Sequence, residues 1–207
     1  MSGVAILHLD ESCLGNGREG QNPGGGGGLI EARSGDDRIQ RRDFYISAPA
    51  TTNNRMALAS AVAALQLLAG KEVRLRVLMV SDSQYLVKGM REWVSGWAAR
   101  GWRRREGAIE NLELWKALVA SARLHDVQWT WVRGHKGHAK NEYANDLAVL
   151  AAQEQRTSEG MVESDFGEWL TARRAKGLYL AYDPDATFTA LEERVLSPRP
   201  FALSEER

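Results

Sequence analysis

The stretch Val4-Ala5-Ile6-Leu7-His8-Leu9-Asp10 decides the fold, because it joins an apolar run to a carboxylate at its end. Such a run is typical of a buried β-strand. A second run, Val73–Val80, has the same character and is followed by Asp82. Functional groups collect where the strands of an open α/β sheet end, so we expect Asp10 and Asp82 to lie together. Two carboxylates repel unless a cation joins them, which indicates a divalent metal site. The alternative is that each aspartate only caps a turn or a helix.

Outward from these strands, the sequence predicts an α/β fold with a five-stranded mixed sheet flanked by helices. The other three strands are expected at Leu29–Ala32, Asp43–Ser47 and Val127–Val132. The glycine-rich stretch Gly15–Gly28 is expected to be a long turn. Helices are expected at Asn54–Leu68, Ser83–Arg100 (as one helix or two), Asn111–Leu124 and Asn141–Gln155.

Two parts of the chain differ in charge and organisation. The 207 residues carry 27 basic and 27 acidic side chains, yet residues 1–153 hold a surplus of four positive charges and residues 154–207 a surplus of four negative ones. We therefore divide the chain into a domain, residues 1–155, and a C-terminal extension of unknown role, residues 156–207. With 43% hydrophobic residues the chain is not disordered as a whole. The single cysteine, Cys13, excludes an intrachain disulfide, and no apolar run reaches the length of a membrane span.

The extension contains a helix pattern at Phe166–Arg174, a strand pattern at Leu178–Tyr182 and a second helix pattern at Ala186–Val195. Its apolar side chains are too many to stay in water, while the segment is too short to bury a core of its own. We expect it to dock on the domain or on a protein partner. Its negative charge favours docking in a basic substrate groove. The alternative is docking on a distant face of the domain.

Basic and aromatic residues alternate between Lys88 and Arg105. Six basic side chains stand there against one acid, and Trp93, Trp97 and Trp102 lie among them. This pattern suits a nucleic-acid backbone, although a solvated helix face with tryptophans packed inward produces the same pattern.

The loop Gly134-His135-Lys136-Gly137-His138 places two histidines three residues apart. They supply at most two of the four ligands that a zinc site needs, because the chain has no cysteine pair to supply the others. A histidine flanked by glycines also suits proton transfer, and the plain alternative is a ring that packs on its own loop.

Five motifs, in order along residues 4–153, resemble bacterial type 1 ribonuclease H. They are the stretches Leu9–Asn16, Thr51–Met56, Ser81–Tyr85, Trp131–His138 and the pairs Asn141-Glu142 and Leu147-Ala148. The resemblance implies a ribonuclease H-like fold and a metal-dependent endonuclease that hydrolyses the RNA strand of RNA–DNA hybrids with Mg²⁺, or with Mn²⁺. It places Asp10 and Asp82 at two of the family's four metal-binding acids and gives His135 a role in proton transfer or product release.

The other two acid positions are substituted. Ala57 stands where the helix acid is expected, and Asn145 stands where the last acid is expected, which leaves Asp10, Asp82 and the neutral oxygen of Asn145 as metal ligands. Asp146 is turned by about 100° on a helix relative to Asn145. Glu11 is expected on the opposite face of its strand from Asp10. Neither is therefore expected to replace a lost acid, and impaired activity follows. The rival interpretation is a catalytically inactive hybrid-binding module, and a weaker one is a scaffold.

The resemblance also implies a nucleic-acid surface in which RNA is distinguished from DNA through its 2′-hydroxyl groups. The residues expected to line it are Cys13, Asn16, Thr52, Asn53, Asn54, Arg55, Gln84, Arg100, Trp102, Arg103, Arg104 and Arg105. We expect a cytoplasmic monomer that has no contact with a membrane.

Overall fold

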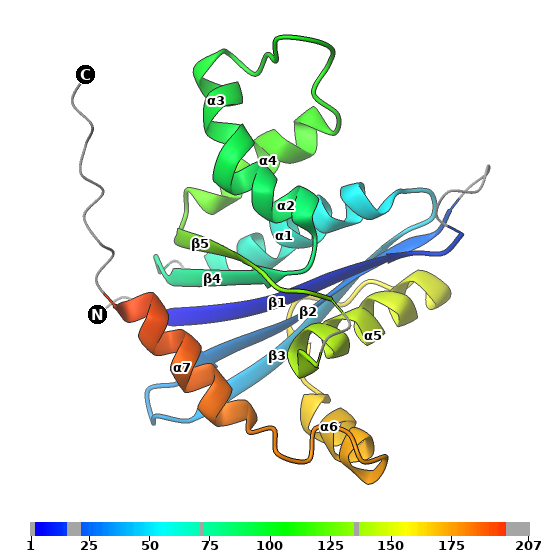
Figure 1. The fold of residues 1–207 in the computed structure, drawn as a ribbon, viewed down its shortest axis with the longest axis vertical. Coiled ribbons are helices and arrows are strands. Elements are labelled where there is room, and N and C mark those ends of the chain that lie inside the picture. The colour runs from blue at the N-terminus through cyan, green and yellow to red at the C-terminus, as the bar shows by residue number, and fades with distance from the viewer. Residues whose placement is uncertain (1–2, 16–21, 71–72, 135–136, 198–207) are drawn as a thin grey trace.

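The structure is a computed structural model that describes residues 3–15, 22–70, 73–134 and 137–197. Its centre is a mixed sheet with helices on both faces, as Figure 1 shows. The strands are β1 (Val4–Cys13), β2 (Gly24–Arg33), β3 (Ile39–Ala48), β4 (Arg76–Ser81), β5 (Asp126–Trp131) and β6 (Val162–Glu163), and they lie in the order β5-β4-β1-β2-β3-β6. β1, β4 and β5 are parallel, whereas β2 is antiparallel to both β1 and β3.

The prediction of an α/β fold with a mixed sheet is confirmed, but the number of strands was wrong. The described sheet has six strands instead of five. The additional strand, β6, pairs with the edge of β3 through Arg42 and Asp43. It is only two residues long and lies in the polar stretch after residue 154, where neither length nor apolar alternation indicates a strand.

The helices form two layers that bury different apolar side chains. One layer holds α1 (Asn53–Ala69), α2 (Gln84–Lys88), the π-helix η1 (Gly89–Trp93), α3 (Val94–Ala99) and α4 (Leu112–Ala122). The other holds α5 (Ala139–Glu154), α6 (Phe166–Ala175) and α7 (Pro184–Leu196). The main core lies under the first layer, and two smaller clusters lie under the second. In the described part of the chain, no helix has the length and apolar character needed to cross a bilayer.

The glycine run is part of a strand, which corrects the prediction of a turn over Gly15–Gly28. Gly24 to Gly28 form the first half of β2 and pair with both β1 and β3. A Cβ atom at Gly25 would lie 2.2 Å from the carbonyl oxygen of Ala148 in α5, and one at Gly26 would lie 1.7 Å from Ser60 Oγ in α1. Glycine is therefore required here because two helices approach the strand from opposite faces, and not because the chain turns.

The C-terminal extension docks on the domain. α7 buries Phe188 and Val195 against Val4, Ile6 and Leu78 of the central strands. α6 buries Phe166 and Leu170 beside Tyr143 of α5. The strand predicted at Leu178–Tyr182 is not formed, because this stretch folds into turns that leave Leu178 and Leu180 exposed.

One buried ion cluster ties three parts of the fold together. Glu31 of β2 is fully buried and binds His8 of β1, Arg41 of β3 and Lys140 of α5 at 3.2, 2.9 and 2.7 Å. Burial alone would raise the pKa of Glu31, but the hydrogen bond from His8 and the charge of Lys140 outweigh it and hold the pKa at about 2. The carboxylate is thus ionised and compensated inside the core.

The close approach of α5 to β2 gives the first prediction. Gly25→Ala should lower the free energy of unfolding by about 1–3 kcal/mol or more, because the new methyl group would overlap with backbone atoms of α5. Gly35→Ala is the matched control, since a Cβ at this turn meets nothing within 4 Å. Urea denaturation of both variants measures the difference, and equal stability would show that α5 can move away from the strand.

Candidate active site

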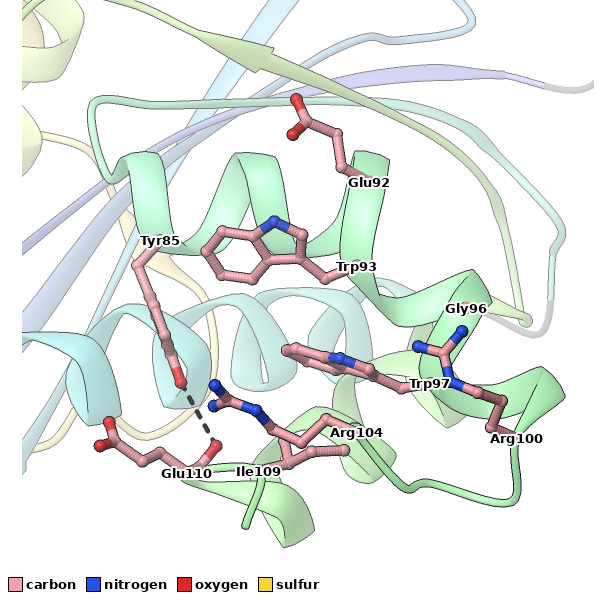
Figure 2. A pocket seen from close by; sticks show the side chains of 9 residues that line it. All are labelled: Tyr85, Glu92, Trp93, Gly96, Trp97, Arg100, Arg104, Ile109 and Glu110. Carbon is pink, nitrogen blue, oxygen red and sulfur yellow. Dashed lines mark hydrogen bonds between the residues drawn. The ribbon is translucent and has the colours of Figure 1, made fainter. Parts of the chain in front are cut away.

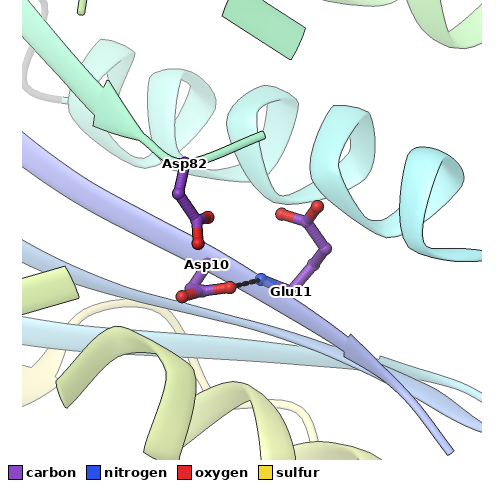
Figure 3. Close-up of side chains that lie close together, drawn as sticks. All are labelled: Asp10, Glu11 and Asp82. Carbon is purple, nitrogen blue, oxygen red and sulfur yellow. Dashed lines mark hydrogen bonds between the residues drawn. The ribbon is translucent and has the colours of Figure 1, made fainter. Parts of the chain in front are cut away.

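Three carboxylates meet at one edge of the sheet. Asp10 and Glu11 lie near the end of β1, and Asp82 directly follows β4. One ligand oxygen of each lies within 4.8 Å of the others, as Figure 3 shows. The prediction that Asp10 and Asp82 would lie together is confirmed in this geometry, and Glu11 joins them.

Glu11 lies in the cluster although it faces the opposite side of β1 from Asp10. The alternation of faces holds, because Asp10 pairs with Gly27, which faces α5, while Glu11 pairs with Gly26, which faces α1. However, β1 continues to Cys13, whereas β4 ends at Ser81, which pairs with Leu9. Within the described part of the chain, no strand covers this side of β1 beyond Leu9, so carboxylates from both faces can reach the open edge where Asp82 lies.

Burial and mutual repulsion both disfavour the charged forms of Asp10 and Glu11. Burial, followed by the charge of Asp82, raises the pKa of Asp10 to about 8. Burial, followed by the charges of Asp10 and Asp82, raises the pKa of Glu11 to about 8. Among the described residues, the groups that oppose these shifts are neutral: the Asn141 side chain and the Glu11 amide for Asp10, and Ser83 for Glu11. A cation would remove the repulsion.

Asn141 is a site residue that the sequence analysis did not identify. Its side chain is buried in the first turns of α5, and its Nδ2 donates to Asp10 Oδ2 at 3.1 Å and to the Leu9 carbonyl at 3.4 Å. The Glu11 amide donates to the other Asp10 oxygen at 2.7 Å. Asp10 is thus held from both sides. The motif Asn141-Glu142 marked the position, but nothing in the sequence identified its partner.

Asp82 is held by the end of β5 and the loop after it. Trp131 Nε1 donates to the Asp82 carbonyl oxygen at 2.9 Å. Gly134 lies so close that a Cβ there would be 2.1 Å from Asp82 Oδ2. Ser83 is the N-cap of α2, so the chain turns into a helix directly after Asp82. These contacts explain why the histidine loop begins with glycine.

The donor set fits a hard divalent cation. Carboxylate oxygens are the ligands that Mg²⁺ and Mn²⁺ prefer, whereas zinc sites are rich in cysteine and histidine. In the residues that the structure describes, Asp10, Glu11 and Asp82 are the group of three or more acidic, histidine or cysteine side chains that could hold a metal. His138 is exposed at the start of α5, and His135 lies outside the described residues, so its predicted role stays a prediction.

The two substituted acid positions lie in helices on opposite faces of the sheet. Ala57 of α1 is 2% exposed and belongs to the main core. Asn145 of α5 is half-buried, one helical turn after Asn141 and therefore on the same side of α5 as that contact to Asp10. Asp146 is turned away and accepts hydrogen bonds from Trp169 and Arg173 of α6. The expectation that Asp146 does not replace Asn145 agrees with this placement.

Five of the twelve predicted nucleic-acid-binding residues lie at the N-terminus of α1 or next to it. Thr52 is the N-cap of α1, and the next three residues, Asn53, Asn54 and Arg55, form its first turn. Cys13 ends β1, and its Sγ donates to the Thr51 carbonyl at 3.3 Å. Asn53 Oδ1 is buried without a hydrogen-bond partner. Gln84 is exposed at the start of α2, and Asn16 lies outside the described residues.

A groove of about 610 Å³ follows the basic segment, as Figure 2 shows. Tyr85, Trp93 and Trp97 line it, with Arg100 and Arg104 at its rim and Glu92 and Glu110 beside them. The rings form a chain, with 5.9 Å between the centroids of Tyr85 and Trp93 and 5.8 Å between those of Trp93 and Trp97. Arg103 and Arg105 are exposed but do not line the groove, and Trp102 is half-buried in the turn after α3.

Comparison with known proteins gives consistent matches over the domain. The sequence model of the family described as RNase H matches residues 3–153. The chain is 45% identical to a ribonuclease H of Aromatoleum aromaticum over 69% of this chain and 86% of the relative, and 41% identical to ribonuclease HI of Caulobacter vibrioides over 72% and 92%.

Among solved structures, the crystal structure of LC9-RNase H1 is similar with a TM-score of 0.77 and 53% identity, and it covers 82% of this chain and 81% of that one. That protein is described as a type 1 RNase H with the type 2 active-site motif. LC11-RNase H1 in complex with RNA/DNA hybrid shares the fold at 18% identity and a TM-score of 0.53, covering 73% of this chain and 98% of that one.

Proposed function

The chain belongs to the ribonuclease H family, and we propose that it hydrolyses the RNA strand of RNA–DNA hybrids at the carboxylate cluster of Asp10, Glu11 and Asp82. The observation that carries this proposal is the approach of the three carboxylates to within 4.8 Å of one another. The family is metal-dependent, and a crowded, buried acidic cluster is the arrangement that metal-assisted phosphodiester hydrolysis requires.

We assign the ligands of Mg²⁺, or of Mn²⁺ in its place, to Asp10, Glu11 and Asp82, with the side-chain oxygen of Asn145 as a neutral fourth group. When bound, the metal supplies a Lewis acid and an activated water for attack on the RNA phosphate. The protein's own residues then have separate tasks. Asn141 and the Glu11 amide orient Asp10. Trp131 and Gly134 fix Asp82. His135 assists proton transfer or product release.

Glu11 takes over the task of the helix acid that Ala57 no longer supplies. Glu11 lies on the α1 face of β1, opposite Gly26, whose nearest neighbour is Ser60. Ala57 lies three residues before Ser60 on that helix and is buried, so its small side chain leaves room for the longer glutamate. The description of LC9-RNase H1, a type 1 protein with a different active-site motif, supports a rearranged ligand set in similar chains.

The rival function, a catalytically inactive module that only binds hybrid, is less well supported. The loss of two acids favours this rival function. With Glu11 as a ligand, however, the proposed set has three carboxylates, only one fewer than the four of the family. The degree of impairment stays a prediction, and it now rests on Asn145 alone. A neutral oxygen at that position weakens the hold on a cation without removing a ligand.

Hybrid binding is assigned to two surfaces that flank the carboxylates. The α1 N-terminus, with Cys13 beside it, offers small polar groups that suit the 2′-hydroxyl groups of RNA. The aromatic groove with Arg100 and Arg104 suits the backbone and bases of the DNA strand. A cytoplasmic location and a monomeric state remain part of the proposal and follow from the reasoning on the sequence alone.

Replacement of Glu11 tests the rearranged ligand set. Glu11→Gln should lower hybrid cleavage in Mg²⁺ by more than about 100-fold, since even groups that only support metal ligands are worth about 10- to 100-fold. Glu113→Gln is the matched control, because Glu113 is exposed on α4 and pairs with Lys116. A labelled-hybrid gel assay measures both variants. Full activity of Glu11→Gln would remove this residue from the site.

Moving the acid from strand to helix tests whether Glu11 and position 57 serve the same task. Glu11→Ala with Ala57→Glu should recover part of the cleavage that Glu11→Ala loses, because a carboxylate is returned to the same interface between β1 and α1. Ala57→Glu alone should give no gain, since Glu11 already supplies that charge. If Ala57→Glu alone raises cleavage strongly while the exchange recovers nothing, the two positions are not equivalent.

The aromatic groove is tested through salt dependence. Arg100→Ala with Arg104→Ala should weaken hybrid binding and reduce the slope of log K against log salt by about 1 for each phosphate that the variant no longer neutralises. Arg38→Ala is the control, because this exposed side chain pairs with Asp36 in the turn between β2 and β3. Fluorescence anisotropy with labelled hybrid over a salt series gives the slopes, and identical slopes would exclude the groove from the binding surface.

A further inference from the structure

We propose that the C-terminal extension acts on the active site through α5, with Trp169 and Arg173 as positioning residues for the helix that presents Asn141 and Asn145 to the carboxylates. The inference goes beyond the proposed function, on which it rests for the task of those two asparagines. It concerns the described part of the extension, residues 156–197, to which the sequence analysis gave no role.

Two sides of helix α5 make different contacts. Asn141 and Asn145 are four residues apart and share one side, and Asn141 donates to Asp10. Lys140, Tyr143 and Asp146 lie on another side, and each contacts the extension. The extension therefore contacts one side of the helix over successive turns, while the other side lies toward the acidic residues.

The contact at Asp146 is the one nearest to Asn145. Trp169 Nε1 donates to Asp146 Oδ2 at 2.7 Å, and Arg173 Nη2 donates to the same oxygen at 2.6 Å. The Arg173 guanidinium lies 4.9 Å from the centre of the Trp169 ring, so the two donors support each other. Because the ion pair is partly exposed, its contribution to stability is small. Its two directed donors instead fix the rotation of the helix about its axis.

The extension makes two further contacts with α5, closer to the start of the helix. Lys140 Nζ donates to the Pro184 carbonyl oxygen at 3.0 Å, at the first residue of α7, as well as to Glu31. The Tyr143 ring packs edge-on against Phe166 and Trp169, with centroid distances of 5.3 and 5.6 Å, and its hydroxyl donates to Asp43. A shift of α6 or α7 would therefore be passed to the turn of α5 that carries Asn141.

The position of the extension argues against docking in the substrate groove. α6 and α7 lie on the opposite side of the sheet from α1 and the basic segment, as Figure 1 shows. The negative charge of this segment is partly used in ion pairs with the sheet, such as Glu192 with Arg33 and Asp185 with Arg41. Competition with nucleic acid is therefore not the effect we expect from it.

The test compares a variant that removes the contacts of α6 to α5 with one that removes an ion pair far from α5. Trp169→Phe with Arg173→Ala keeps an aromatic ring but removes both donors to Asp146. Arg38→Ala is the control, because this exposed side chain pairs with Asp36 in the turn between β2 and β3. Both variants are made in the full chain, and their melting temperatures are measured first.

Two readouts do not depend on cleavage. Amide hydrogen exchange of residues 139–154 should be faster in the double variant than in the control, and Mn²⁺ binding to the free protein should weaken by about 10- to 100-fold, as for groups that orient metal ligands. In a background with both Asn141→Ala and Asn145→Ala, the effect of the double variant on Mn²⁺ binding should largely disappear, since both side chains that α5 presents to the carboxylates are already removed.

Equal exchange and equal Mn²⁺ affinity in the double variant and the control would overturn the inference and leave the extension a purely stabilising layer. An undiminished effect in the background with both Asn141→Ala and Asn145→Ala would also overturn it, because the effect would then bypass α5. Failure of the native chain to cleave hybrid would refute the proposed function instead, while exchange and Mn²⁺ binding would still decide the role of Trp169 and Arg173.

Discussion

Helix α5 lies so close to β2 that a single methyl group at Gly25 or Gly27 would collide with its backbone. The rest of the structure depends on this approach. At this distance the side chain of Asn141 reaches Asp10 across the neighbouring strand. The same approach allows Lys140 to enter the core beside Glu31. Backbone contact of this kind sets how close the helix lies to the sheet.

Buried carboxyl groups on two neighbouring strands have opposite pKa shifts, because their partners differ in charge. Glu31 is surrounded by His8, Arg41 and Lys140, and its pKa is held at about 2. Among the described residues, the donors that oppose burial and mutual repulsion at Asp10 and Glu11 are neutral, and the pKa of each is raised to about 8. The first site is held by cationic partners and serves the fold. At the second, a divalent cation would relieve the repulsion between the carboxylates.

The sequence predicted the fold class, the main helices and the meeting of Asp10 with Asp82, because hydrophobic runs and the acids after them are local signals. It failed where the cause lies in a distant neighbour. Glycine runs usually indicate turns, and only the approach of the α5 backbone and of side chains such as Ser60 of α1 explains why glycines stand in this strand. Glu11 was set aside because strand neighbours face opposite ways. That rule assumes strands on both sides, whereas β4 ends before Glu11 is reached.

In the proposed ligand set, an acid on the strand in place of one on the helix would change how the site is held together. A ligand in α1 would depend on the packing of that helix against the sheet, whereas Glu11 is covalently next to Asp10, and its amide binds the Asp10 carboxylate. Two of the three acids then move as one unit with β1. The remaining mobile supports are the turn that carries Asp82, fixed by Trp131, and helix α5, fixed by the extension. With one neutral group in the ligand set, the geometry of the remaining oxygens matters more, and an additional structural layer behind α5 is consistent with that need.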